Sequence, residues 1–223
     1  VEPALSDQGW RFGDFPGSNR DDLNGATYLH ELYSRAEPTF TGRATVPVLW
    51  DKERKTIVNN ESADIVRMLN TGFGALADES VDLYPQALRA EIDALNERIY
   101  PALNNGVYRA GFATTQVAYE EAYQGVFAML DELEARLADG RPFLTGSAFT
   151  EADIRLFVTL IRFDAAYYGL FKCTRQRLAD HAALSAYTKR VLDLPGVRDT
   201  VNIDHIKHGY YSIKSLNPNR IVP

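Results

Sequence analysis

The stretch Thr45–Ser62 constrains the fold of this 223-residue chain more than any other. Two β-branched runs, 45–50 and 56–58, flank a charged connection, a pattern that is typical of an antiparallel hairpin. Pro47 lies within the first run. Because proline has no N–H to donate to a ladder, this position predicts an edge, a bulge, a bend or a cis peptide bond.

The residues that follow the hairpin predict a helix start able to bind an anion. The polar run 59–62 precedes apolar residues at helical spacing, and the helix is expected to end near Gly72. Free N–H groups and a positive dipole end at a helix N-terminus suit a carboxylate. The stretch alone leaves open an ordinary capped helix that binds nothing.

Composition excludes several classes of function. The formal net charge of −6 gives no basic footprint for nucleic acid or an anionic membrane. No apolar run approaches the roughly 20 residues of a membrane span, and the N-terminal residues show no secretory signal. A single cysteine excludes an internal disulfide and is typical of a reducing compartment, so a cytoplasmic location is expected. Of the four histidines only His205 and His208 have ligand spacing, and we expect no metal site.

The periodicity changes along the chain. Residues 1–20 are rich in turns, and a short helix is predicted over 22–35. After residue 85 every periodic segment is helical, and the tail 202–223 is expected to be irregular. The predicted helices cover 88–103, with a kink at Pro101 and a stop at 104–106, then 115–137, 152–163 and 184–194. The sequence therefore predicts an α+β unit over residues 1–73 and an all-helical domain over 84–223.

The unit at 1–73 looks incomplete, because a two-stranded hairpin is marginal by itself and no preceding sequence supplies further strands. In the helical half, Thr150 and Asp153 form a capping box, and Glu151 is also interpreted as a capping residue rather than as an acid or base. Cys173 is interpreted as a packing residue, although the adjacent Lys172 could lower its pKa.

Five tyrosines suggest a pocket for an aromatic ligand. Tyr108 follows a polar Asn-Asn-Gly run, Tyr167 and Tyr168 follow the buried helix 152–163, and Tyr210 and Tyr211 lie in the tail. Tyrosine hydroxyls can donate to a phenolate or quinone oxygen, while the rings line a flat pocket. The alternative is that all five are half-buried aromatics at helix ends.

Together these features resemble the glutathione transferase superfamily, and more narrowly its Xi class, the glutathionyl-hydroquinone reductases. That resemblance implies an α+β fold with a thioredoxin-like N-terminal domain, incomplete in this chain, and an all-helical C-terminal domain. It covers nearly the whole chain. The strings that carry it are Gly9-Trp10, Tyr28-Leu29, Gly42-Arg43, Thr45–Asp51, Asn59–Ser62, Asn104–Tyr108, Ala110–Phe112, Leu144–Gly146, Thr150–Arg155, Arg162–Asp164, Phe171–Cys173 and Asp204–Ile206.

The resemblance also implies where glutathione, the cosubstrate, binds. Glu61 and Ser62 would hold its γ-glutamyl end at the helix start. Val46, before a cis-Pro47, would pair backbone to backbone with its cysteinyl part.

Further site residues follow from the same family pattern. Trp10 would pack on the tripeptide, and Arg43 would reach its glycyl carboxylate. Tyr108, Tyr167 and Tyr210 would bind the hydroquinone oxygens. The family implies a homodimer whose partners are otherwise small molecules.

The family reaction uses a cysteine thiolate that attacks the thioether sulfur of a glutathionyl-hydroquinone; a second glutathione then resolves the mixed disulfide. That cysteine lies in a Cys-Pro-Trp-Ala-type motif, which these residues lack, and Cys173 matches another family position. We therefore expect the chain as printed to be inactive and a chain with the motif to be active. A conventional S-transferase and a non-catalytic glutathione-binding relative remain the alternatives.

Overall fold

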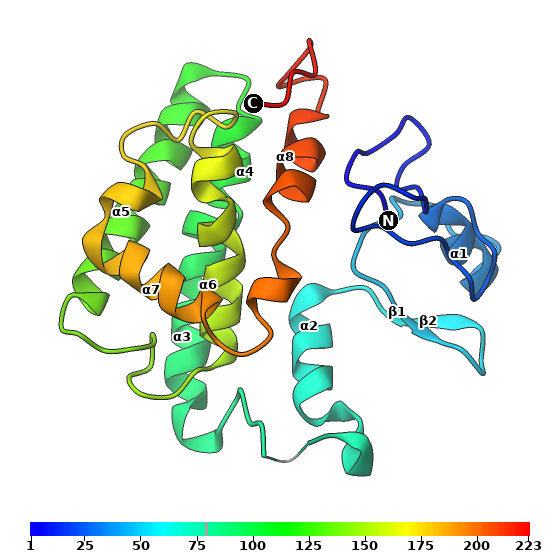
Figure 1. Ribbon diagram of the computed structural model, residues 1–223, viewed down its shortest axis with the longest axis horizontal. Coiled ribbons are helices and arrows are strands. Elements are labelled where there is room, and N and C mark those ends of the chain that lie inside the picture. Colours follow the sequence, from blue (N-terminus) through cyan, green and yellow to red (C-terminus); the bar gives the residue numbers. More distant parts are fainter. Residues whose placement is uncertain (79) are drawn as a thin grey trace.

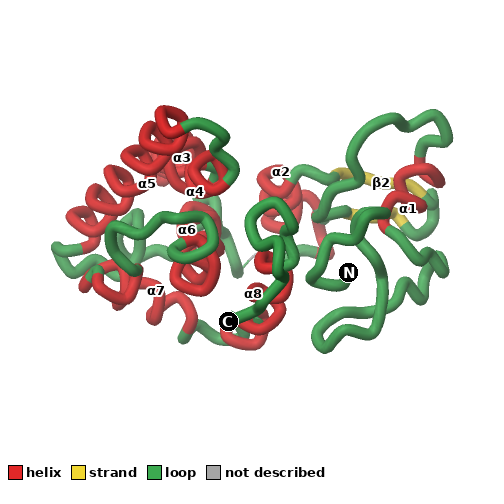
Figure 2. Tube along the Cα trace, turned by 90° about the horizontal axis from the view of Figure 1, so that it is seen from above, coloured by secondary structure: helices red, strands yellow, loops and turns green. Residues whose placement is uncertain are grey.

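The computed structural model describes residues 1–78 and 80–223 and shows a small N-terminal part beside a helical bundle (Figure 1). In two perpendicular views α2 and α8 lie between the N-terminal part and the other bundle helices (Figures 1 and 2). The strands are β1 (Leu49–Asp51) and β2 (Thr56–Asn59); the helices are α1 (Leu29–Ala36), α2 (Ser62–Arg67), α3 (Arg89–Ile99), α4 (Gly106–Gly111), α5 (Gln116–Leu137), α6 (Glu151–Arg162), α7 (Ala182–Leu192) and α8 (Ile203–Tyr211).

The hairpin prediction is confirmed. β1 and β2 pair antiparallel, with an irregularity in the register between Leu49 and Trp50. The peptide bond between Val46 and Pro47 is cis, and β1 begins two residues later, so the proline stays outside the ladder. One face of the hairpin packs on α1 in a small apolar core, which offsets the marginal stability of two strands alone.

Helix α1 starts later than the sequence predicted. The Asp21 carboxylate accepts hydrogen bonds from the N–H groups of Leu23, Asn24 and Ala26, and these bonds hold residues 21–26 in a turn. The helix starts only where the Glu31 carboxylate accepts from the N–H groups of Thr27 and Tyr28. The local hydrogen bonds of the Asp21 carboxylate therefore replace the first helical turn that the periodicity predicted.

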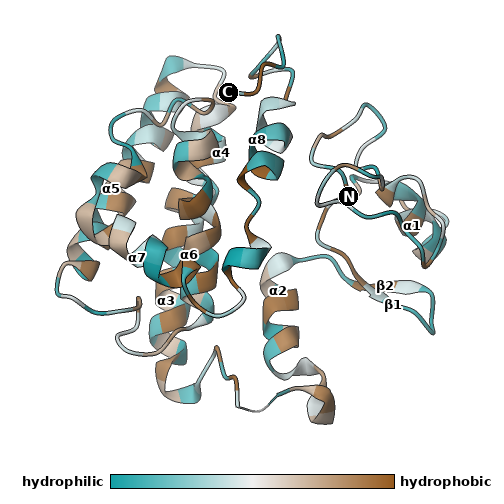
Figure 3. Cartoon of the chain, in the orientation of Figure 1, coloured by the Kyte–Doolittle hydropathy of each residue, from teal (hydrophilic) through white to brown (hydrophobic). Residues whose placement is uncertain are grey.

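The bundle holds one large core. Apolar side chains of α3 to α7 are buried together, among them Ile92, Leu130, Leu156, Phe163 and Tyr187. Helix α6 lies in the middle of the bundle, and Figure 3 shows apolar colour along much of it. Seven of its residues are buried, as its sequence indicated. The bundle is therefore a rigid support for side chains that α6 presents to α2 and α8.

The helical path that begins with α3 does not end at 104–106, where the sequence predicted a stop. Residues Tyr100–Asn104 form one wide π-helical turn around Pro101, and α4 then resumes at Gly106. The Asn104 amide explains the continuation, because its Nδ2 donates to the Arg155 carbonyl at 2.9 Å and to Thr159 Oγ1 at 2.6 Å on α6. The predicted kink is present, as a widened turn.

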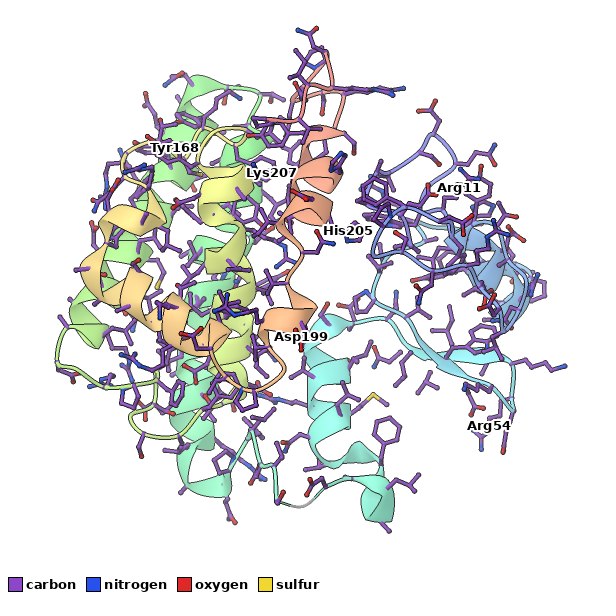
Figure 4. All side chains as sticks on the ribbon, viewed as in Figure 1. Arg11, Arg54, Tyr168, Asp199, His205 and Lys207 are labelled. Carbon is purple, nitrogen blue, oxygen red and sulfur yellow. The ribbon has the colours of Figure 1, made fainter. Side chains whose placement is uncertain are left out.

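The tail prediction is wrong for its first half. Residues Ile203–Tyr211 form α8, whose start is capped by the Asn202 Oδ1 that accepts the His205 N–H at 2.9 Å. Figure 4 shows His205 on α8 facing the N-terminal part, where Phe15 stacks on its ring at 5.8 Å. Ile203, Ile206 and Tyr210 have helical spacing, but the helix is short and the tail 202–223 as a whole is rich in His, Tyr and Asn.

Asp153 closes the predicted capping box at α6, whereas Glu151 has a different role. The Glu151 side chain is 1% exposed and accepts from Arg67 Nη2 at 3.0 Å, Asn96 Nδ2 at 3.0 Å and Arg155 Nη2 at 3.1 Å. These bonds connect α2, α3 and α6 through a single buried carboxylate. Glu151 therefore fixes α2 against the bundle.

A second carboxylate at this junction gives a pH-dependent prediction. Asp93 accepts from Tyr84 Oη at 2.6 Å and from Arg67 Nη2 at 2.5 Å, and these contacts lower its pKa. A carboxyl whose pKa is lower in the folded than in the unfolded protein stabilises the fold when it is ionised. This stabilisation is fully present above the unfolded pKa of about 3.9 and is lost as the pH falls through the folded pKa. Thermal unfolding of Asp93→Asn should therefore show a lower midpoint than the parent at neutral pH. The gap should close in acid, and a gap independent of pH would contradict the assignment.

Candidate functional site

A groove of about 530 Å³ lies between α2 and the bundle and joins the two halves of the expected site. One end is formed by Val46 and by Ser62 at the start of α2; the other by Tyr108, Tyr167 and Tyr210. Its remaining lining residues are Ala63, Val66, Tyr100, Asn104, Ile154, Arg155, Val158, Thr159 and Arg162. Five residues that the sequence placed in one site thus share a single groove.

The end near α2 is held by a small polar network. Tyr33 Oη donates to the Thr45 carbonyl at 2.8 Å, and Asn60 Nδ2 donates to Tyr33 Oη at 3.1 Å. This network ties the backbone before Pro47 to the segment that starts α2, so Val46 and Ser62 line the same wall. The first-turn N–H groups of a helix have no intrahelical partner, so they are available to a ligand at this wall.

Four residues assigned by resemblance lie outside the groove lining. Trp10 packs in the small core beside α1, and its carbonyl accepts the Leu29 N–H at 2.8 Å. Arg43, Pro47 and Glu61 are exposed, and Arg43 makes no hydrogen bond or ion pair with the residues described. Glu61 is the N-cap of α2, but its side chain makes no capping bond.

The three tyrosine hydroxyls meet at the other end of the groove. Tyr210 Oη lies 2.6 Å from Tyr108 Oη and 2.6 Å from Tyr167 Oη, while Tyr108 and Tyr167 are 3.5 Å apart. Tyr108 comes from α4, Tyr167 from the turn after α6 and Tyr210 from α8. The buried ring of Phe171 contacts all three at 5.2–5.7 Å between centroids. Sequence reasoning named the three residues, and the structure brings them together.

Burial keeps the hydroxyls of Tyr167 and Tyr210 protonated. Burial, reinforced by the neighbouring tyrosines, raises the pKa of Tyr167, which is 2% exposed. Burial also raises the pKa of Tyr210. Neutral phenols donate hydrogen bonds, so the cluster offers protons to a ligand throughout the neutral pH range.

Sequence reasoning missed the wall that α6 contributes. Arg155, Val158, Thr159 and Arg162 line the groove and lie at positions i, i+3, i+4 and i+7 of one helix. This spacing places them on a single face, which a helical-face analysis of the segment could have found.

Cys173 is confirmed as a packing residue. Its side chain is fully buried, and burial raises the pKa of the thiol to about 12. At neutral pH it is therefore a neutral thiol rather than a thiolate nucleophile. Lys172 does not activate it.

Two further observations concern the described part of the chain. No group of three or more His, Cys, Asp or Glu side chains is placed to hold a metal ion. None of the helices there has the length and apolar character of a membrane span.

Gly111 gives a prediction about the support of the tyrosine cluster. A Cβ at this position would lie 2.5 Å from the Phe171 ring, whereas a Cβ at Gly125 on α5 would contact nothing within 4 Å. Gly111→Ala must displace the ring that touches all three tyrosines, and overpacking of this kind costs about 1–3 kcal/mol. The matched control Gly125→Ala should be neutral or stabilising by up to about 1 kcal/mol. Urea unfolding measures both, and equal effects would contradict the assigned role of Phe171.

Comparisons with known proteins agree with this geometry. The family model for the glutathione S-transferase C-terminal domain matches residues 116–190. The glutathionyl-hydroquinone reductase YqjG of Escherichia coli is 49% identical over all of this chain and 68% of its own length. The reductase PcpF of Sphingobium chlorophenolicum is 50% identical over all of this chain and 71% of its own length.

Solved structures give the same result. The glutathione-bound structure of YqjG matches with a TM-score of 0.97 and 48% identity, over all of this chain and 73% of that one. Glutathione transferase Xi 1 of Trametes versicolor matches with a TM-score of 0.96 and 45% identity, over all of this chain and 79% of that one. The chain therefore belongs to the glutathionyl-hydroquinone reductases, the Xi class of the glutathione transferase superfamily.

Proposed function

We propose that the groove binds a glutathionyl-hydroquinone, with the peptide at the α2 end and the ring at the tyrosine end. The chain then serves the glutathione-dependent reduction of that conjugate to the free hydroquinone. One observation carries the proposal: Val46 and Ser62 line the same groove as Tyr108, Tyr167 and Tyr210. A thioether that joins a peptide to an aromatic ring needs such a two-ended site.

The α2 end suits the polar peptide. Ser62 and the first-turn N–H groups of α2 receive the γ-glutamyl carboxylate, and Glu61 is near enough in sequence to meet its ammonium group. The Val46 backbone pairs with the cysteinyl unit beside Pro47. Trp10 and Arg43, which lie outside the lining in this structure, are assigned to the rest of the tripeptide on family grounds. Glutathione bound to the related YqjG supports this end of the proposal.

The tyrosine end suits the quinol, and a count of protons identifies the donor. Three hydroxyls carry three protons, and the two contacts of 2.6 Å use two of them. One proton remains for a ligand. All three tyrosines line the groove, but Tyr167 is 2% exposed and Tyr108 is 38% exposed, so we assign the remaining proton to Tyr108. With this assignment the chain of donors runs from Tyr167 through Tyr210 to Tyr108, and each bond polarises the next.

In the proposed reaction the groove residues bind the conjugate, and a thiolate attacks it. The thiolate attacks the thioether sulfur, the carbon–sulfur bond breaks, and the ring carbon takes a proton as the hydroquinone leaves. A second glutathione thiolate then attacks the mixed disulfide and releases glutathione disulfide with the original thiol. The buried, protonated Cys173 does not supply the attacking sulfur. The groove residues hold the two ends of the conjugate so that its sulfur is presented.

Turnover tests this proposal. The printed sequence is joined to a strand–helix unit with a Cys-Pro-Trp-Ala-type motif and incubated with a glutathionyl-hydroquinone and glutathione. We expect hydroquinone and glutathione disulfide in equal amounts, and no release when the motif cysteine is replaced by serine. A chain that binds the conjugate without release, or that instead couples glutathione to a chlorinated nitroarene, would contradict the proposal.

The proposal has a structural counterpart at the level of domains and assembly. Residues 1–73 form the glutathione-binding unit and 84–223 the helical domain, in a cytoplasmic homodimer whose other partners are small molecules. Exposed apolar side chains at Leu69, Phe73 and Leu76, the last 90% exposed, support association of two copies. Light scattering on a sizing column measures the mass, and a monomer at micromolar concentration would contradict the dimer.

A further inference from the structure

The groove is positively charged although the chain as a whole is acidic. Its lining contains two arginines, Arg155 and Arg162, and no aspartate or glutamate, while the net charge of the chain is −6. Arg155 is neutralised locally, because its Nη2 lies 3.1 Å from the buried Glu151 carboxylate. Arg162 forms no ion pair with the residues described. The unbalanced charge of the groove therefore comes from Arg162.

The surroundings of Arg162 leave most of its donors for a ligand. Its Nη1 donates to the Val158 carbonyl at 2.5 Å, within its own helix, and a guanidinium has five N–H groups. The nearest carboxylate in sequence, Asp164, accepts instead from the N–H groups of Leu178 and Ala179. A groove-lining guanidinium without a counter-ion is a site for an oxyanion.

We propose that Arg162 makes the tyrosine end of the groove select a ring hydroxyl in its ionised, phenolate form. The proposal rests on the proposed function, because it assumes that the quinol ring lies at the tyrosines. It defines a substrate class: conjugates of hydroquinones whose electron-withdrawing substituents acidify a ring hydroxyl. Such a hydroxyl, when ionised, accepts from Tyr108 and is balanced by the charge of Arg162.

The groups that face this position agree with a phenolate. The titratable or charged residues of the lining are Tyr100 before α4, Tyr108 on α4, Tyr167 after α6, Tyr210 on α8 and Arg155 on α6; α2 contributes only uncharged Ser62, Ala63 and Val66. The charge of Arg162 reaches the tyrosines, since it opposes the rise that burial causes in the pKa of Tyr210. A more acidic phenol at the same place would ionise in preference to these tyrosines.

The probe for the test is 4-nitrophenol, whose phenolate absorbs visible light and which ionises near neutral pH. It is titrated with saturating protein across pH, which gives its pKa in the bound state. An opposite charge nearby lowers a pKa by about 1–3 units, so we expect the parent chain to lower that of the bound probe by about one unit or more. Arg162→Gln should raise the pKa of the bound probe above its value in the parent, and Arg162→Lys should raise it by less.

Two controls make the result decisive. Arg198→Gln removes a surface arginine that pairs with Asp193 and does not line the groove. This variant should leave the pKa of the bound probe unchanged. Arg162→Met is a second neutral variant if Arg162→Gln does not fold, which a thermal scan detects. An equal bound pKa in the parent and in a neutral Arg162 variant would overturn the proposal, and so would an unshifted pKa in the parent.

The outcome is separable from that of the proposed function. If a glutathionyl-hydroquinone displaces the probe while the pKa stays unshifted, the groove binds the conjugate and only the role of Arg162 is wrong. If the conjugate does not displace a bound probe, the ring does not lie at the tyrosines, and the proposed function fails with it.

Discussion

Replacement of Asp153 by alanine is expected to lower the free energy of unfolding by more than about 3 kcal/mol. The fully buried carboxylate accepts from the backbone N–H groups of Leu144 at 2.9 Å and Thr150 at 2.8 Å, and from Tyr187 Oη at 2.9 Å. Alanine leaves these donors buried without a partner, and each unsatisfied group costs about 1–3 kcal/mol. The same change removes the capping box of α6, the helix at the centre of the bundle.

Denaturant unfolding followed by circular dichroism measures this loss. Tyr187→Phe is the matched control, because it removes one of the donors and keeps the carboxylate with its backbone partners. We expect the control to lose about 1 kcal/mol. A loss below about 1 kcal/mol for Asp153→Ala itself would show that α6 does not depend on this network.

Replacement of Tyr108 by phenylalanine is expected to weaken binding of a glutathionyl-hydroquinone by about 10–100-fold. Tyr108 is the most exposed of the three tyrosines and, in the proposed order, the end of the donor chain through Tyr210. A hydrogen bond to a charged oxygen contributes about 1.5–3 kcal/mol, and each 1.4 kcal/mol is a factor of ten. Binding of glutathione alone should stay unchanged, because the α2 end of the groove keeps all its residues.

Calorimetric titration of both ligands measures the effect, and Tyr167→Phe is the control. Tyr167 has a buried hydroxyl at the far end of the donor chain, so its loss should weaken conjugate binding by less than about ten-fold. Equal losses in the two variants would contradict the assigned order of donors. A loss of glutathione affinity in Tyr108→Phe would show that the two ends of the groove are not independent.

Local signals in the sequence predicted the parts of the fold that depend on local bonds. The hairpin with its excluded Pro47 and the capping box at Thr150 and Asp153 were both found, because turn chemistry and caps act within a few residues. Helix α8 was missed, since its short run with two His and two Tyr gains its stability from packing and from the cap at Asn202.

The residue types of the candidate site were predictable from the sequence, but the contacts between their side chains were not. The resemblance named Tyr108, Tyr167 and Tyr210, but their mutual contacts join segments up to 102 residues apart. The partner of Arg155 is Glu151, a carboxylate that the sequence had grouped with capping residues. That Arg162 has no such partner within the described residues can be learned only from the three-dimensional structure. Long-range pairing of this kind leaves no periodic signal in a single sequence.

The most direct test of a two-ended groove is a competition titration with glutathione, a free hydroquinone and their conjugate. We predict that the conjugate displaces both small ligands and binds at least about ten-fold more tightly than either, because its two ends share one loss of translational freedom. If the conjugate displaces only one of them, or binds no more tightly than glutathione, the groove does not hold both halves of the substrate.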